Sequence, residues 1–169
     1  MVDSAKDTLE HRSKVKSFMG KFCMNLLNRA DVHDESKLHE PEKSQFDRVS
    51  EAHPLAKSEY GSSEYNAGKA MLGPALEHHY QVNDHHPQHF PDGVAGMNLY
   101  QLVEMYVDWR AASCRNANGS IVSSVQHNIG EFNLDPQLAS ILMNTAQLDE
   151  FGEGKPLDGD NGTPGGHAI

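Results

Sequence analysis

The sequence has few cysteines and no long apolar run, and each absence narrows the class of protein. Cys23 and Cys114 are the only cysteines among 169 residues, too few for a disulfide framework, so free thiols in a reducing compartment are expected. No stretch approaches the roughly 20 apolar residues of a membrane-spanning helix. The first residues, MVDSAKDTLEHRSK, lack the apolar segment of a signal peptide. We therefore expect a cytoplasmic protein with no membrane partner.

Basic residues are also scarce: 14 lysines and arginines stand against 24 acidic residues, for a net charge of −10. Proteins that bind the phosphate backbone of long nucleic acids show the opposite balance. A small anionic substrate remains compatible with this charge, because a bound divalent cation reverses the local field. A long nucleic acid is therefore not an expected partner.

The spacing of apolar residues predicts helices, and no alternating strand pattern, internal repeat or glycine-rich phosphate loop is present. Between about Ala5 and Arg29, apolar residues from Val15 to Leu27 recur at three- and four-residue intervals, which predicts a helix with one buried apolar face. His11 lies four residues before Val15 and belongs to that face. A lone histidine there is more often a satisfied core residue than a ligand, so its interpretation depends on partners.

The remaining helices are predicted from their start and stop signals. A helix is expected after Pro41, and another from about 64 to 81, interrupted at Gly73-Pro74. Asn98 is expected to cap a helix that runs to about Cys114, and shorter helices should begin near 121 and 136. The prediction is an all-α, compact bundle in one domain over residues 1–151, with a flexible glycine-rich tail at 152–169.

Histidine is the residue type that this chain has in excess. Five of its eleven histidines lie between residues 77 and 90, and imidazole is the commonest protein ligand of transition metals. The helical spacing favours His79 over His78 as the inward side chain. His85 and His86 lie in a loop rich in proline and glycine, where they have three alternatives: metal binding, substrate binding or packing. A surface tract that binds nothing is the plain alternative for the whole group.

Two acidic positions accompany the histidines. Asp34 directly follows His33 at the expected end of the first helix, from where both side chains can reach one ion. Asp108 lies on a helix that is apolar on both sides, where a carboxylate needs a cation or hydrogen-bond donors. An ion pair with Arg110 or Arg115 is the structural alternative for Asp108.

The order of His11, His33-Asp34, the middle histidines and Asp108 resembles the HD-domain metallohydrolase superfamily over roughly residues 8–114. Lys37, three residues after Asp34, is similar to the HD-x-x-K arrangement of its HD-GYP branch. The run HHPQHFPDGVAGMNLYQLVEMYVDW also looks like a segment of that branch, although the middle histidines are closer together here and the GYP triplet is absent. HDESK, HHYQVNDHHPQHF and EMYVDW together look closest to an uncharacterised HD-like family of phages and bacteria.

The resemblance implies one divalent transition metal (Mn, Fe, Co, Ni or Zn) bound by His11, His33, Asp34 and Asp108. In the binuclear alternative, His79 and His85 hold a second ion. The implied activity is a metal-dependent phosphohydrolase that uses an activated water on a nucleotide or a similar small phosphoester. The catalytic candidates are Glu35, Lys37, His79 and His86, and the substrate-binding candidates are Arg29, Lys37, His85 and His86.

Two rival functions share this ligand set. Some HD proteins hold two irons and oxidise small molecules with O₂, which makes a di-iron oxygenase the second hypothesis. The third is a non-catalytic, metal-stabilised module that binds a partner. Self-association as a homo-oligomer is left open. An exposed aromatic residue such as Tyr60, Tyr65 or Phe90 would fit either a dimer contact or a pocket that stacks on a base, and the sequence does not decide between the two.

Overall fold

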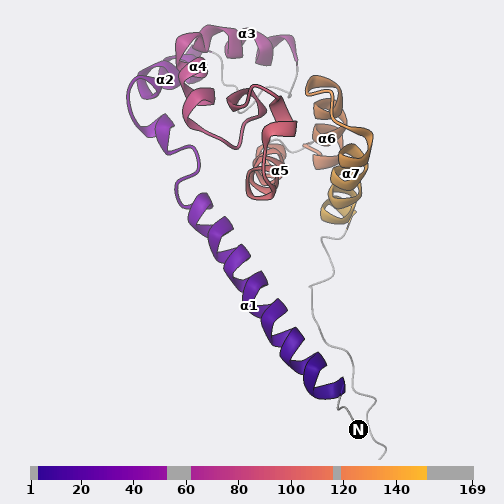
Figure 1. Cartoon of the computed structure of the whole chain (residues 1–169). Coiled ribbons are helices and arrows are strands. Elements are labelled where there is room, and N and C mark those ends of the chain that lie inside the picture. Colours follow the sequence, from indigo (N-terminus) through magenta and orange to yellow (C-terminus); the bar gives the residue numbers. More distant parts are fainter. Residues whose placement is uncertain (1–3, 53–61, 116–118, 152–169) are drawn as a thin grey trace, which may run out of the picture.

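The chain begins with one long helix, α1 (Ser4–Ala30), whose first half projects away from the other helices in the computed structural model (Figure 1). The structure describes residues 4–52, 62–115 and 119–151. The tail at 152–169, for which flexibility is expected, lies outside the described residues. Within the described ranges no residue forms a strand, and the all-α prediction is confirmed.

Shorter elements follow α1. The α-helices among them lie in the order that the sequence predicts, and the 3₁₀ helices were not predicted. The elements are η1 (Glu35–Leu38), α2 (Glu42–Ala52), α3 (Ser63–Leu72), α4 (Pro74–Val82), η3 (Pro87–His89), η4 (Gly93–Gly96), α5 (Leu99–Ser113), α6 (Ile121–Glu131) and α7 (Pro136–Phe151). Their boundaries come from local chemistry. The Ser62 hydroxyl accepts the Tyr65 amide at the start of α3, Pro74 opens α4, and Asn98 forms a capping box with Gln101 at α5.

Helix α5 separates the two parts of the globular body (Figure 1). One side of α5 packs on α6 and α7 through an apolar core that includes Met105, Trp109, Val125 and Leu142. Its opposite side carries polar residues toward the last turn of α1, the turn that follows α1 and the loop after α4. Because side chains one turn apart share a helix face, α5 presents apolar and polar groups to different neighbours.

The predicted α1 helix is present, but the prediction of a buried apolar face is wrong. None of its residues is buried, and Phe18 is 67% exposed. Only the last turns of α1 reach the body, where the Phe22 ring stacks on Tyr100 with centroids 4.5 Å apart. The physical reason is length, because the helix extends past the helices that it packs against. No helix within the described residues is both long and apolar enough to cross a membrane.

Candidate metal centre

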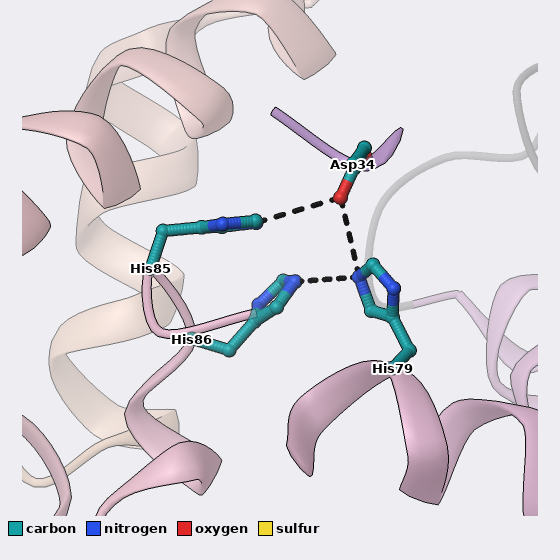
Figure 2. Close-up of side chains that lie close together, drawn as sticks. All are labelled: Asp34, His79, His85 and His86. Carbon is teal, nitrogen blue, oxygen red and sulfur yellow. Dashed lines mark hydrogen bonds and ion pairs between the residues drawn. The ribbon is translucent and has the colours of Figure 1, made fainter. Parts of the chain in front are cut away.

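His33 and Asp34 are placed by the turn that follows α1. Asp34 adopts a left-handed backbone conformation with φ of 58°, which aspartate tolerates better than most residues. The 3₁₀ helix η1 then brings Lys37 back toward it, so that the Lys37 ammonium donates to Asp34 Oδ2. The other oxygen, Oδ1, points toward the histidines of α4 and the next loop (Figure 2).

Helix α4 turns His79 inward, as its helical position predicts, and leaves His78 partly exposed. The fully buried Glu42 accepts from both rings, with His79 Nδ1 at 2.9 Å and His78 Nδ1 at 2.7 Å. Ser36 donates to the same carboxylate. Burial alone would raise the pKa of Glu42, but these hydrogen bonds lower it, so the group stays ionised. An ionised carboxylate only accepts, so Glu42 favours the tautomer of His79 that carries its proton on Nδ1 and has a lone pair on Nε2.

The inner side of His79 faces three further atoms that can bind a metal ion. Its Nε2 lies 3.3 Å from Asp34 Oδ1 and 2.9 Å from His86 Nε2, and His85 Nε2 lies 3.5 Å from the same Asp34 oxygen. Asp34 Oδ1 and His85 Nε2 are buried, and neither has a hydrogen-bond partner among the described residues. Buried polar atoms without partners are rare and require an explanation. A cation among these four side chains would satisfy them all.

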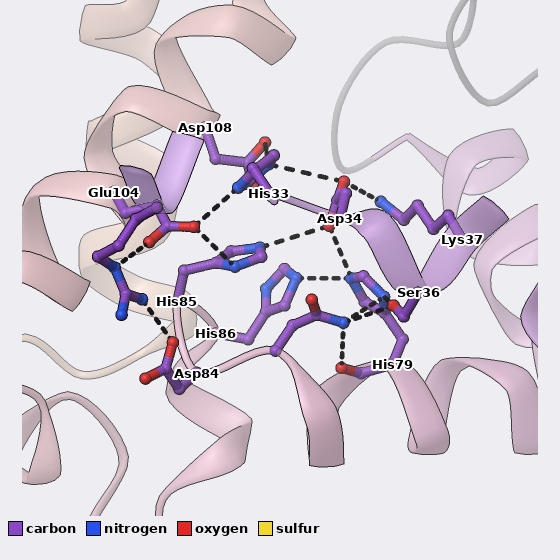
Figure 3. Close-up of polar contacts among 12 residues, drawn as sticks. His33, Asp34, Ser36, Lys37, His79, Asp84, His85, His86, Glu104 and Asp108 are labelled. Carbon is purple, nitrogen blue, oxygen red and sulfur yellow. Dashed lines mark hydrogen bonds and ion pairs between the residues drawn. The ribbon is translucent and has the colours of Figure 1, made fainter. Parts of the chain in front are cut away.

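A second group of donors adjoins the first and shares His85 with it (Figure 3). His33 Nε2 lies 3.6 Å from Asp34 Oδ2 and 3.6 Å from Asp108 Oδ1. Behind these rings, Glu104 Oε1 faces His33 Nδ1 at 3.0 Å and His85 Nδ1 at 3.4 Å. A carboxylate on one ring nitrogen that leaves the other free is the usual support of a metal-ligating histidine.

The pKa values follow from burial and neighbouring charges. Asp108 and Glu104 raise the pKa of His33 to about 10. Burial lowers the pKa of His86 to about 3, helped by the neighbouring His85, and burial with the charge of His33 lowers that of His85. Burial opposes ionisation of Asp34, yet His79 and Lys37 hold its pKa well below the usual range. At neutral pH, His85 and His86 therefore carry no charge, which is the form that binds metals.

Arg29 joins three elements at the edge of this centre. From the last turn of α1, its guanidinium donates to Glu104 on α5 and to Asp84 in the loop after α4. Gln101 donates to the other oxygen of Asp84 at 2.6 Å. A cavity of about 130 Å³ lies here, lined by Arg29, Val32, His33, Val82, Asn83, Asp84, His85 and Glu104. A larger, open hollow of about 630 Å³ lies on α6 and α7, away from this centre, and its lining includes His127 but no carboxylate.

Most of the residues singled out from the sequence meet in this centre: Arg29, His33, Asp34, Lys37, His79, His85, His86 and Asp108. His11 does not. It is exposed on α1, roughly 28 Å along the helix from its C-terminal end at 1.5 Å per residue, so its predicted place in the ligand set is wrong within one copy. Glu35 is exposed at the start of η1. Arg29 and Lys37 are both engaged with carboxylates of the protein.

Two important carboxylates were missed from the sequence. Glu104 lies one helical turn before Asp108, so their shared face was a usable signal. Glu42 carries no such signal, because the histidines that it holds lie 36 and 37 residues further along the chain.

Comparison with known proteins returns one match. The model of a protein family described as "Family of unknown function (DUF5662)" matches residues 2–148. No curated protein matches the chain, and no solved structure does.

Proposed function

The chain belongs to the family of unknown function DUF5662, and we propose that it is a metal-dependent phosphohydrolase acting on a nucleotide or a similar small phosphoester. The observation that carries this proposal is the convergence of three potential ligand atoms, Asp34 Oδ1, His79 Nε2 and His85 Nε2. Glu42 and Glu104 stand behind the two rings and orient them.

The donor types fit a divalent transition metal. Nitrogen-rich sets with one or two carboxylates suit Mn, Fe, Co, Ni or Zn better than Ca. Asp34, His79, His85 and His86 would hold one ion, and His33 with Asp108 and His85 are the candidates for a second. When bound, such an ion lowers the pKa of water and polarises a phosphoryl oxygen. His11 has no place in either group.

The exposure of the side chains indicates where a substrate would approach. The side chains of His33 and Asp108 are 26% and 25% exposed, whereas those of His79 and His85 are 2% and 3% exposed. The His33–Asp108 side is therefore the open one. Lys37 borders Asp34 and is 33% exposed, so its ammonium is the cation best placed to neutralise a phosphate oxygen. Arg29, held by two carboxylates, serves to position the site.

A substrate panel tests the proposal. The protein is stripped with a chelator, reloaded with Mn²⁺, Co²⁺ or Ni²⁺, and assayed for phosphate release from nucleotides and from a generic aryl phosphate. His79→Gln should lose metal and turnover, and His78→Gln, whose amide still donates to Glu42, should keep both. Parent protein that binds metal but turns over nothing on the panel would instead be a metal-stabilised binding module. Parent protein that binds no metal would refute the site.

His86 has two candidate roles that one variant separates. Its Nε2 lies near His79 Nε2, which fits a metal ligand, and burial keeps it neutral, which also fits a proton acceptor. If His86→Ala retains metal and loses turnover, by about ten- to ten-thousand-fold, the residue is an acid–base group. Loss of metal in the same preparation assigns it to the ligand set.

The adjacent donor groups also support a second candidate, a di-iron oxygenase. Two groups that share His85 and both contact Asp34 would place two ions close together. Imidazole-rich sites of this kind accept iron. An iron-dependent optical band that changes on exposure to O₂, together with oxidation of a small molecule and no phosphate release, would favour this function over hydrolysis.

A further inference from the structure

The first half of α1 carries large apolar side chains that no other described helix covers, and only the ammonium of Lys21, from the same helix, lies over the Phe18 ring. Val15, Phe18 and Met19 are 41%, 67% and 63% exposed. Single exposed apolar residues are common on protein surfaces, but a contiguous group marks a contact site. These three lie three and four residues apart, so they form one stripe along the helix.

The same stripe is a packing surface further along α1. Continuing at helical spacing, it reaches Phe22, Leu26 and Arg29, which are all less exposed than the first half. Phe22 stacks on Tyr100, and Arg29 binds Glu104. Because α1 is one uninterrupted helix, its first half cannot turn back onto its own body (Figure 1). The apolar face of α1 is thus packed against the body near the C-terminal end of the helix and is exposed in its first half.

The charge of α1 is opposite to that of the rest of the chain. Residues 4–30 contain six lysines and arginines against two acidic residues, and the remainder contains eight against 22. The helix is therefore attracted to an acidic surface such as the body of another copy. A nucleic acid or an anionic membrane would attract α1 as well, but it would repel the strongly acidic remainder.

Two further observations favour a second copy. Helix α5, which already receives the last turns of α1, exposes the apolar side chains of Leu99 and Val107, at 59% and 54%. The uncovered part of α1 spans roughly 18 residues, and helices in proteins draw most of their stability from the packing of an apolar face against other elements. A contact that covers it would therefore stabilise the helix itself.

We propose that a second copy of this chain covers the first half of α1, in a twofold-symmetric dimer in which each α1 packs on the acidic body of the other copy. Each copy carries both a basic helix and an acidic body, so the exchange is reciprocal and closes at two subunits. This inference goes beyond the proposed function and does not depend on it, because it involves none of the metal-binding side chains.

The test compares two neighbouring charge substitutions in the full chain. Phe18→Glu places a carboxylate in the stripe, and Ser17→Glu places the same charge roughly 100° around the helix, away from it. Light scattering coupled to size exclusion, and sedimentation at several protein concentrations, should show a dimer for the parent and for Ser17→Glu. Phe18→Glu should weaken dimerisation by at least about tenfold. Raising the salt concentration should weaken the parent dimer too.

Three outcomes would overturn the proposal. The first is a parent chain that stays monomeric at high micromolar concentration, and the second is a dimer that Phe18→Glu leaves intact. The third is a monomeric parent that binds vesicles containing phosphatidylserine, which would assign the stripe to a membrane surface. Circular dichroism of both variants checks that the helix content is retained. None of these measurements needs metal or turnover, so a failed hydrolase assay leaves them interpretable.

Discussion

At the scale of single residues, Asp34 is the side chain on which the centre depends most. One of its oxygens faces His79 and His85, and the other faces His33 and Lys37. Its left-handed backbone conformation aims the side chain inward from the end of α1. The carboxylate thus contacts histidines of both donor groups, and its charge is the one that a bound cation would neutralise first.

Asp34→Asn tests this role directly. The amide keeps the shape but replaces a charged donor with a weaker neutral one, so metal affinity should fall by at least about 100-fold. Asp31→Asn, an exposed neighbour with the same loss of charge, is the matched control and should bind metal like the parent. Isothermal titration with Mn²⁺ and Co²⁺ after chelation measures both. Equal affinity in the two variants would remove Asp34 from the ligand set.

Glu42→Gln tests the support behind His79. Glu42 is fully buried and accepts hydrogen bonds from His78, His79 and Ser36. In the variant, the amide N–H of glutamine would point at the N–H of one histidine ring, or that ring N–H would lose its acceptor. Either outcome should lower the free energy of unfolding by about 1–3 kcal/mol. Glu40→Gln, at an exposed position, should change it by less than about 0.5 kcal/mol. Urea unfolding of the two variants measures this difference. Identical unfolding midpoints for both variants would contradict the buried hydrogen-bond network around Glu42.

At the scale of elements, the break between α3 and α4 decides which histidine faces the centre. Gly73 joins the two helices with φ of 47° and ψ of −123°, a conformation that side chains with a Cβ rarely adopt. Pro74 then restarts the helix in a new direction, and His79 follows on its inner face. The backbone angle at one glycine therefore sets the orientation of α4.

Gly73→Ala should destabilise the fold by about 1–3 kcal/mol through backbone strain. Steric conflict makes no contribution, because a Cβ at Gly73 meets no atom within 4 Å. Gly130→Ala is the control, since it lies inside α6 with equally open space and a negative φ. That change should be neutral or should stabilise by up to about 1 kcal/mol. Thermal or urea unfolding measures the difference, and equal effects at both sites would contradict strain at Gly73.

Sequence reasoning predicted the elements better than their contacts, for a physical reason. Helix ends depend on local chemistry, such as the amide side chain of Asn98 or the ring of Pro74, and this chemistry is visible in the sequence. Burial depends on what lies opposite. The apolar pattern of α1 is real, but nothing local shows that the body is shorter than the helix. His11 was misplaced for that reason, and the buried role of Glu42 was missed because its partners are distant in the chain.

At the scale of the whole molecule, ionisable groups with opposite pKa shifts make stability depend on pH in two directions. The folded state raises the pKa of His33 from 6.5 to about 10. The contribution of His33 to the free energy of unfolding is therefore fully present below pH 6.5 and is lost as the pH rises toward 10. The folded state lowers the pKa of His86 to about 3. The contribution of His86 to the free energy of unfolding is therefore fully present above pH 6.5 and is lost as the pH falls toward 3. These two histidines therefore predict a stability maximum near neutral pH in the metal-free protein.

Unfolding of the metal-free protein in urea across the pH range measures this curve. On each side the free energy of unfolding should fall by on the order of 2 kcal/mol from these groups, after the pKa shifts are discounted for solvent screening. His33→Gln should flatten the alkaline side. The acid side should become shallower but persist, because His86 still contributes there and Lys37 and His79 still lower the pKa of Asp34. His127→Gln, outside the centre on α6, is the control and should keep both sides of the curve.

Saturating metal should reverse the trend on the alkaline side, because a ligating His33 must first lose its proton and metal binding therefore strengthens as the pH rises. A metal-bound protein whose alkaline side still falls like that of the chelated protein would show that His33 keeps its proton and ligates no ion.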